Sequence, residues 1–323
     1  MLSKKFWVGV LVGAGVAASA MPAMAQGYPE RPIRLIIPYG QGGATDTIGR
    51  MFSGPMEEQL GVPIVVTNQP GAGGAVGLAS ALSAAPDGYT IAIGSDSSLS
   101  ARPLMTESGY DIDSIQPVAR AVQSPMTFVV QETSEIDGVD ELLQQMADGD
   151  MTWSSPGVGS GPHLGAESFF AQQGVSAQHV TSASAGEALV KLLAGEVEMI
   201  SVVGSNVAGI LGDPETPVRV LGVANEGRWE RMPDSATFEE QGYDYARPVW
   251  FGFVAPAGTP DEIVSTLAST IEGILSADES SELLDNFHMS AAFQSPEEFG
   301  GQIAAEAEEF GSVLSAIGMA REQ

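Results

Sequence analysis

A glycine-rich stretch at residues 38–46, Pro-Tyr-Gly-Gln-Gly-Gly-Ala-Thr-Asp, has the composition of an anion-binding turn. It follows an apolar run at residues 33–37, typical of a buried strand, and precedes a helical pattern that begins near Ile48. A glycine turn at the start of a helix leaves backbone N–H groups unpaired at the positive end of the helix dipole. Such a turn suits a carboxylate or phosphate, although it is also a common way to reverse the chain.

The sequence offers little support for catalysis. Residues 157–161 read Gly-Val-Gly-Ser-Gly, which places the serine one position too late for the G-x-S-x-G nucleophile motif. The three histidines, His163, His179 and His288, lack the spacing of metal ligands, and residues 71–77 miss the last glycine of the dinucleotide motif by one position. We therefore expect no enzyme activity, no metal site and no cofactor. His163 keeps two interpretations, a ligand contact or packing at the start of a helix.

The first 25 residues have the pattern of a secretory signal peptide. Lys4 and Lys5 precede an apolar run at residues 6–18, and Ala23-Met24-Ala25 matches an A-x-A cleavage site. The alternative is an uncleaved membrane anchor, for which the apolar run is short. We expect cleavage near Ala25 and no stable membrane insertion afterwards.

Charge and cysteine content exclude several classes of protein. The chain has 13 basic and 41 acidic residues, and loss of Lys4 and Lys5 with the leader leaves 11 basic residues and a net charge of −30. Such a charge argues against binding to nucleic acid or to anionic membranes. The acidic residues are spread along the chain, which leads us to hypothesise a solvated acidic surface adapted to high salt. The absence of cysteine excludes disulfides, a thiol nucleophile and a lipid-modified cysteine.

The order of strand and helix patterns predicts an α/β protein with two lobes. Strands expected at residues 33–37, 64–67 and 90–93 each lead through a loop into a helix or a serine-rich turn. Strands at 126–130 and 249–254 are expected to cross between the lobes. The predicted division is residues 26–124 plus 255–323 for the first lobe and 125–254 for the second, with a ligand cleft between them.

Local helix signals give further expectations. We expect Thr45 or Asp46 to cap the first helix, and Pro55 to kink or divide it. Ser160 is expected to cap the helix that starts beside it. Capping boxes are expected at residues 184–187, 259–262 and 295–298.

An ordered set of short motifs extends this interpretation. In chain order it comprises Pro29-Glu30-Arg31-Pro32, Gly42-Gly43-Ala44-Thr45-Asp46, Pro70-Gly71-Ala72-Gly73-Gly74, Ala85-Pro86-Asp87-Gly88-Tyr89, Gly157-Val158-Gly159-Ser160, Arg231-Met232-Pro233-Asp234 and Phe251-Gly252-Phe253-Val254-Ala255-Pro256. Together these motifs closely resemble the Bug (TctC-like) family, the periplasmic substrate-binding proteins of tripartite tricarboxylate transporters. The resemblance covers nearly the whole chain after the leader.

The resemblance implies a type II periplasmic-binding-protein fold of the Venus-flytrap kind, which closes on a small organic carboxylate. Family members hold one ligand carboxylate through backbone groups and small hydroxyl side chains from both lobes. Neutral donors of this kind suit a chain whose mature part has a single lysine, Lys191. The matching ligand-binding positions are Tyr39, Gly42, Gly43, Ala44, Thr45 and Asp46 in the first loop, Ser95, Ser97 and Ser98 in the serine loop, and Ser155, Gly159, Ser160 and His163 in the second lobe.

The second lobe departs from the family pattern at residues 180–186. Many members carry a Val-Pro-Tyr-x-Gly type segment there, whereas this chain reads Val-Thr-Ser-Ala-Ser-Ala-Gly. Ser182 and Ser184 are therefore candidate ligand donors, although Ser184 is also placed to cap a helix. Arg102 and Arg247 are candidates for a second carboxylate, or else surface ion-pair partners.

The resemblance implies an exported, periplasmic binding protein that passes a di- or tricarboxylate-like acid to the membrane permease subunits of a tripartite tricarboxylate transporter. Two alternatives remain open at this point. One is a ligand-sensing periplasmic component of a signalling system, and the other is a periplasmic hydrolase.

Overall fold

The computed structural model describes residues 27–41, 44–149 and 151–321. The predicted signal peptide and the predicted site residues Gly42 and Gly43 lie outside the described residues. In the described part, one curled sheet has the strand order β2-β1-β3-β9-β4-β7-β5-β6, and β10 and β8 also pair with β4.

The strands alternate with helices along most of the chain, as an α/β protein requires. The strands are β1 (Ile33–Ile37), β2 (Ile64–Asn68), β3 (Thr90–Ser95), β4 (Ile115–Gln131), β5 (Thr152–Ser155), β6 (Gln178–Thr181), β7 (Met199–Val203), β8 (Val218–Ala224), β9 (Pro248–Pro256) and β10 (Ser290–Gln294). The helices are α1 (Ala44–Leu60), α2 (Ala75–Leu82), α3 (Arg102–Met105), α4 (Val139–Asp148), α5 (Gly161–Gln173), α6 (Ala185–Leu193), α7 (Asp261–Leu275), α8 (Asp278–Asn286) and α9 (Pro296–Ala316). Short helical turns are η1 (Ala72–Gly74), η2 (Ser97–Ala101, a π turn), η3 (Ile112–Ser114), η4 (Gly204–Asn206) and η5 (Glu239–Gln241).

The first part of the sheet contains the parallel strands β2, β1 and β3, with β9 antiparallel beside β3. Helix α1 covers it because Ile48, Phe52 and Met56 recur every four residues and form a buried stripe. The rings of Phe52 and Phe253 meet edge to face at 5.1 Å. This geometry is favourable for aromatic pairs and fixes α1 against β9.

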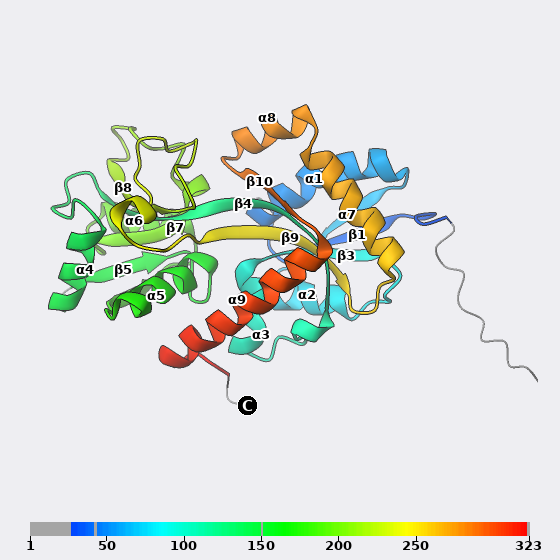
Figure 1. Ribbon diagram of the computed structural model, residues 1–323, viewed down its shortest axis with the longest axis horizontal. Coiled ribbons are helices and arrows are strands. Elements are labelled where there is room, and N and C mark those ends of the chain that lie inside the picture. Colours follow the sequence, from blue (N-terminus) through cyan, green and yellow to red (C-terminus); the bar gives the residue numbers. More distant parts are fainter. Residues whose placement is uncertain (1–26, 42–43, 150, 322–323) are drawn as a thin grey trace, which may run out of the picture.

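Two long strands join the parts of the molecule (Figure 1). The first half of β4 pairs with β9, and its second half, from Met126 on, pairs with β7 and β8. The chain returns at Arg247, whose carbonyl accepts a hydrogen bond from the Met126 N–H at 3.2 Å. The crossing strand predicted at residues 126–130 is therefore only the end of a longer strand.

The second part has its own core of aromatic rings. Phe128 of β4 packs edge to face on Phe169 of α5 and on Phe238, at 5.7 and 5.0 Å between ring centroids, and tilted on Phe170 at 5.5 Å. All four side chains are fully buried. Two separate cores on one shared pair of strands explain why the molecule has two lobes.

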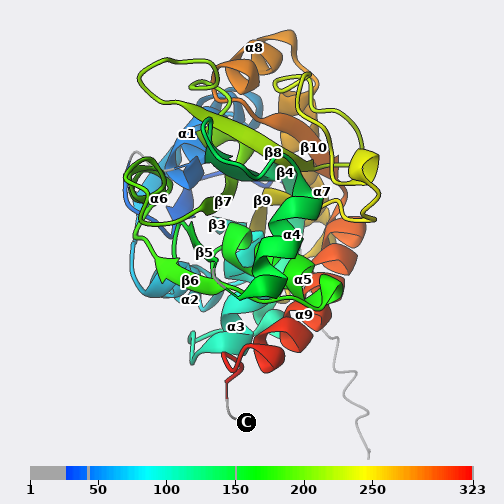
Figure 2. The ribbon, with the colours of Figure 1, turned by 90° about the vertical axis from the view of Figure 1, so that its left-hand side faces the viewer.

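Helix α9 contacts both parts of the molecule. Its predicted capping box is confirmed, since Ser295 and Glu298 exchange side-chain and backbone hydrogen bonds. Phe299 packs on Trp250 of β9 at 5.0 Å, while Phe310 lies in one apolar cluster with Leu164 of α5. Figure 2 shows α9 running beside α5.

Several local expectations were not met. Helix α1 begins at Ala44, so Thr45 and Asp46 lie in its first turn rather than at its cap. The division of α1 at Pro55 does not occur, since the helix continues to Leu60; the alternative, a kink there, stays a prediction. The box at Thr259 does not form, because its hydroxyl donates to the Pro256 carbonyl at 2.7 Å and leaves Pro260 as the N-cap of α7. At residues 184–187 the Ser184 cap is confirmed but the box is incomplete, because the Glu187 carboxylate accepts from the Ala183 N–H at 3.0 Å.

Candidate functional site

Loops that follow β1, β2, β3 and β5 meet where the two parts of the molecule face each other. A Cβ added to Gly73 would lie 2.0 Å from Nη2 of Arg102, and a Cβ added to Gly161 would lie 2.4 Å from Oδ2 of Asp96. A Cβ at Gly159 would lie 3.8 Å from the same Arg102 nitrogen. At Gly73 and Gly161 a side chain would collide with these charged groups, so glycine allows the close approach there. The structure therefore brings together loops that are distant in sequence.

Tyr39 belongs to this group of loops. Its hydroxyl donates to the Gly73 carbonyl at 3.2 Å. Burial raises the pKa of the Tyr39 hydroxyl, and nearby Ser98, Ser95 and Arg102 oppose that rise. The hydroxyl therefore stays protonated and can act as a hydrogen-bond donor.

The predicted serine loop lies beside Tyr39 and is held by its own hydrogen bonds. The Ser98 hydroxyl accepts from the Ser95 N–H at 2.8 Å and donates to the Ser95 carbonyl at 3.1 Å. The hydroxyls of Ser95 and Ser97 are 3.2 Å apart, and Tyr110 donates to the Ser98 carbonyl. The Ser98 hydroxyl thus has both a donor and an acceptor within its own loop, whereas Ser95 and Ser97 keep hydrogen-bonding capacity for another group.

Arg102, directly after the serine loop, is the cation of this site. It takes part in none of the ion pairs found among the described residues, and its Nε has no hydrogen-bond partner there. Arg247, the other arginine considered from the sequence, instead pairs with Glu309 at 2.6 Å and lies over the Phe310 ring. Arg247 thus has an ion-pair partner, whereas Arg102 has none among the described residues.

Asp96 is a buried acid that the sequence reasoning did not select. Its side chain is 1% exposed; Oδ1 accepts from the Ser97 N–H at 2.6 Å, and Oδ2 has no partner among the described residues. Burial raises its pKa to about 7, the nearby Glu306 adds to the rise, and the Ser97 N–H and Arg247 oppose it. Oδ2 faces Gly161, the first residue of α5, where the helix dipole favours negative charge.

Asp46 supports the first loop through a closed set of hydrogen bonds. Its Oδ1 accepts from Nδ2 of Asn68 at 2.8 Å and from Nε of Arg50 at 3.0 Å. Arg50 also donates to the Asn68 oxygen at 2.9 Å, and Asn68 donates to the Tyr39 carbonyl at 3.0 Å. The i, i+4 spacing of Asp46 and Arg50 was the signal that could have revealed this pairing. Of the neighbouring predicted residues, Thr45 is buried and Ala44 is exposed.

The start of α5 has the predicted cap. The Ser160 hydroxyl accepts from the His163 N–H at 3.3 Å, and Pro162 lies in the first turn. The Gly159 N–H donates to Nδ1 of His163 at 3.3 Å, which closes the turn back on the helix. Gly159 itself has φ +78°, a left-handed conformation that favours glycine.

His163 lies among aromatic rings rather than in open space. His163 is 3% exposed. Its ring stacks on that of Trp153 with 5.6 Å between the centroids, and it meets the ring of His179 edge to face at 4.4 Å. Burial lowers the pKa of His163 to about 3 and that of His179 to about 4. The Ser155 hydroxyl, also buried, lies 2.9 Å from Nε2 of His179. These contacts favour packing of a neutral His163 at the start of α5.

The two serines of the divergent segment lie in different environments. Ser182 is 1% exposed, and its hydroxyl lies 2.8 Å from that of Ser154. Ser184 is exposed and accepts from the Glu187 N–H at 3.2 Å as the cap of α6. Among the described residues, neither serine forms a hydrogen bond with Tyr39 or Arg102.

Within the described residues, no group of three or more His, Cys, Asp or Glu side chains has the arrangement of a metal site. None of the helices described is both long and apolar enough to cross a membrane.

Comparisons with known proteins identify the family. A family model described as the tripartite tricarboxylate transporter family receptor, TctC, matches residues 48–319. The chain belongs to the TctC family. A UPF0065 protein of Bordetella pertussis is 33% identical over 272 residues, which is 83% of this chain and 84% of that protein.

Solved structures agree with the TctC assignment. A TctC solute-binding protein from Polaromonas, solved without ligand, has a TM-score of 0.78 at 30% identity, over 90% of this chain and 99% of that one. An R. palustris protein solved with adipate has a TM-score of 0.77 at 26% identity, over 91% of this chain and 99% of that one. The family resemblance and the two-lobed α/β fold predicted from the sequence are thus confirmed. This chain is a TctC-family periplasmic solute-binding protein.

Proposed function

We propose that this TctC protein captures a small organic di- or tricarboxylate where the loops after β1, β2, β3 and β5 meet. Arg102 carries the proposal. In a chain with 41 acidic residues, its guanidinium lies among glycine and serine loops without an acidic partner in the described part of the chain. A ligand carboxylate would supply the charge-assisted hydrogen bonds that the protein itself does not.

The surrounding groups fit the same ligand. Tyr39 lies near Arg102, and Ser95 and Ser97 of the adjoining serine loop offer hydroxyls that can donate to a carboxylate. Asp46 is neutralised by Arg50, so its charge does not oppose a bound anion. The remaining predicted positions, Gly42, Gly43, Ala44, Thr45, Ser98, Ser155, Gly159, Ser160, His163, Ser182 and Ser184, are proposed to shape the site or the elements that carry it.

Binding is proposed to shift the lobes toward a closed form. The approach of Asp96 to Gly161 and of Arg102 toward Gly159 is proposed to bring loops of the first lobe, residues 26–124 plus 255–323, to those of the second, residues 125–254. A ligand that touches both sets of loops stabilises the closed state over the open one. The closed form would then be the one recognised by the permease subunits of a tripartite tricarboxylate transporter.

Family membership and the adipate-bound relative support an acid as the ligand. The pattern of residues 1–25 supports export with cleavage near Ala25, which would release the protein into the periplasm. We keep the transporter as the partner because the matching family is described as its receptor.

The test compares Arg102→Gln with Arg228→Gln by isothermal titration calorimetry against adipate, succinate and citrate. Arg228 is a matched control because it loses the same charge from an exposed ion pair with Glu240. Since a hydrogen bond to a charged group is worth about 1.5–3 kcal/mol, Arg102→Gln should weaken the best carboxylate about tenfold or more. Arg228→Gln should leave its affinity unchanged. Equal affinities for wild type and Arg102→Gln would refute the proposal.

A further inference from the structure

A second polar cavity has a lining that includes none of the Arg102 loop residues, although two of its residues, Arg247 and Glu306, lie near Asp96. Its volume is about 620 Å³, and its walls come from β4, from the loop after β8, from the start of β9, from β10 and from α9. Its charged lining residues include Arg120, Arg247 and Glu306. A volume of this size falls within the range of small-molecule sites.

The lining holds an unusual number of polar atoms without partners. Nε of Arg120 and Nη2 of Arg247 are buried donors with no hydrogen-bond partner among the described residues. Three buried acceptors also have no hydrogen-bond partner among the described residues: Oε1 of Gln123, Oε1 of Gln294 and Oε2 of Glu306. Both arginine residues are buried, at 8% and 9% exposure. Unpaired buried polar groups destabilise a protein, so such a set indicates a place built to receive a polar partner.

Three of these side chains, Arg120, Arg247 and Glu306, are already fixed through their other atoms. Nη1 of Arg120 donates to Gln302 at 2.8 Å, and Nη1 of Arg247 donates to Glu309 at 2.6 Å. Oε1 of Glu306 accepts from the Trp250 ring N–H at 2.7 Å. The side chains therefore hold their positions without a ligand, as a preorganised site requires.

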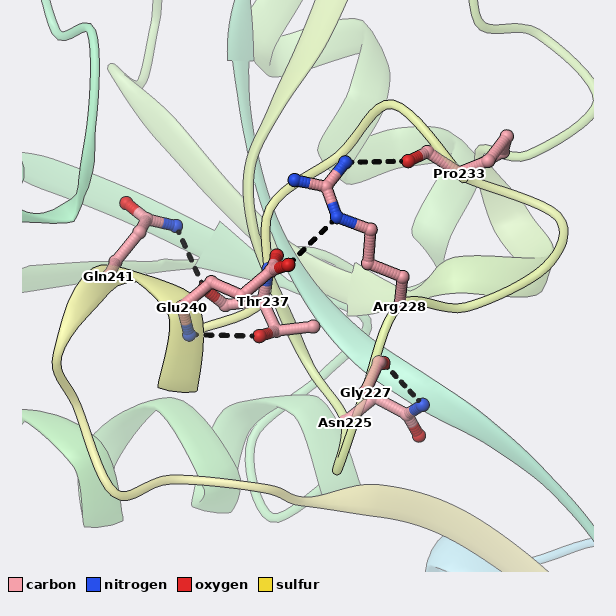
Figure 3. Close-up of polar contacts among 7 residues, drawn as sticks. All are labelled: Asn225, Gly227, Arg228, Pro233, Thr237, Glu240 and Gln241. Carbon is pink, nitrogen blue, oxygen red and sulfur yellow. Dashed lines mark hydrogen bonds and ion pairs between the residues drawn. The ribbon is translucent and has the colours of Figure 1, made fainter.

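One wall of the cavity comes from the loop after β8, which also has a fixed shape (Figure 3). Nδ2 of Asn225, a lining residue, donates to the Gly227 carbonyl at 2.9 Å. Arg228 then ties the loop together by donating to Glu240 at 2.8 Å and to the Pro233 carbonyl at 2.7 Å. The opposite wall is α9, so the cavity lies between an element of the second part and a helix that contacts both.

The inventory of free atoms defines the ligand chemistry. Two guanidinium donors match the two oxygens of one carboxylate. Three acceptors, one of them a carboxylate oxygen, match the three N–H groups of an ammonium. A dicarboxylate would place its second charge against the carboxylates of Glu226, Glu306 and Glu309, which also line the cavity. We propose that this cavity binds a small zwitterion of the α-amino-acid class, separately from the carboxylate held at Arg102.

The test titrates glycine, L-serine and L-asparagine into the wild-type protein by calorimetry, with acetate and methylammonium as single-charge controls. At least one amino acid should bind, and both controls should bind at least tenfold more weakly. Glu306→Gln should weaken amino-acid binding at least tenfold, whereas Arg102→Gln should change it less than twofold. Circular dichroism checks that Glu306→Gln is folded. A second variant, Gln294→Leu on β10, removes an acceptor from another wall and should also weaken amino-acid binding at least tenfold.

The outcomes are decisive in both directions. Absence of amino-acid binding to the wild type would overturn the proposal. The proposal would also be overturned if Arg102→Gln lost amino-acid binding while Glu306→Gln kept it, because the amino acid would then occupy the first site. Because neither result depends on a carboxylate binding at Arg102, a failure here leaves the proposed function standing.

Discussion

The buried carboxyl of Asp96 offers a quantitative test of the closed loop arrangement. The side chain is 1% exposed and faces the first residue of α5 from the opposite lobe. Asp96→Asn keeps its shape and its hydrogen bond from Ser97 but removes the ionisation. The substitution should therefore change stability only at pH values above the pKa that the Asp96 carboxyl has in the unfolded state, where ionisation is favoured outside the folded protein.

The size and sign of the effect follow from the pKa. Burial raises the Asp96 pKa from 3.8 to about 7, so the folded state retains a proton that the unfolded state has already released. Wild-type stability should therefore fall as pH rises from about 4 to 7. At about 1.4 kcal/mol per pH unit, the accumulated loss is about 4 kcal/mol. Asp96→Asn avoids this loss and should match wild type near pH 4 but exceed its stability by up to about 4 kcal/mol at pH 8.

The assay is urea unfolding followed by circular dichroism at each pH from 4 to 8. The comparison between variant and wild type removes contributions that both share, including those of the histidines. Asp234→Asn serves as the control because Asp234 is exposed on the loop after β8; it should stay within about 0.5 kcal/mol of wild type at every pH. A stability difference for Asp96→Asn that does not change with pH would refute the reasoning.

Three further predictions follow from single sites. Phe128→Ala should lower the free energy of unfolding by about 3–5 kcal/mol because it opens a cavity among three aromatic rings, and a loss under 1 kcal/mol in urea unfolding would contradict that packing. Ser184→Ala should cost about 1 kcal/mol as a lost helix cap and leave carboxylate affinity within twofold; a tenfold weaker affinity by calorimetry would instead make Ser184 a ligand donor. His163 and His179, whose pKa values are lowered to about 3 and 4, should stay neutral at pH 6, so their contribution to stability is complete above pH 6.5 and is lost as pH falls toward 4. NMR titration midpoints near 6.5 for both rings would show that they are not buried as described.

Local signals in the sequence predicted much of the fold. The Ser160 cap, the box at Ser295 and the apolar stripe of α1 depend on residues within one or two turns, and all three are confirmed. The capping box predicted at residues 259–262 does not form because the Thr259 hydroxyl donates instead to the Pro256 carbonyl, an acceptor that a capping pattern does not take into account. Strand β10 was missed because Ser290–Gln294 is short and only partly buried, and its position depends on pairing with β4.

The candidate site was less accessible to sequence reasoning, because it depends on contacts between distant loops. Nothing local to Asp96 indicates that it faces Gly161, 65 positions away in the numbering. Likewise, the sequence does not show which of Arg102 and Arg247 has an acidic partner, because only the fold places Glu309 beside Arg247. The sequence could identify the loops by composition, but the choice among their charged residues required the structure.

The most direct test of the central claim is a calorimetric titration of the purified wild-type protein with adipate, succinate and citrate, with glucose as the uncharged control. We expect at least one acid to bind stoichiometrically, to raise the melting temperature with concentration, and to be recovered chemically unchanged. Binding of glucose with no response to any of the acids would contradict the account.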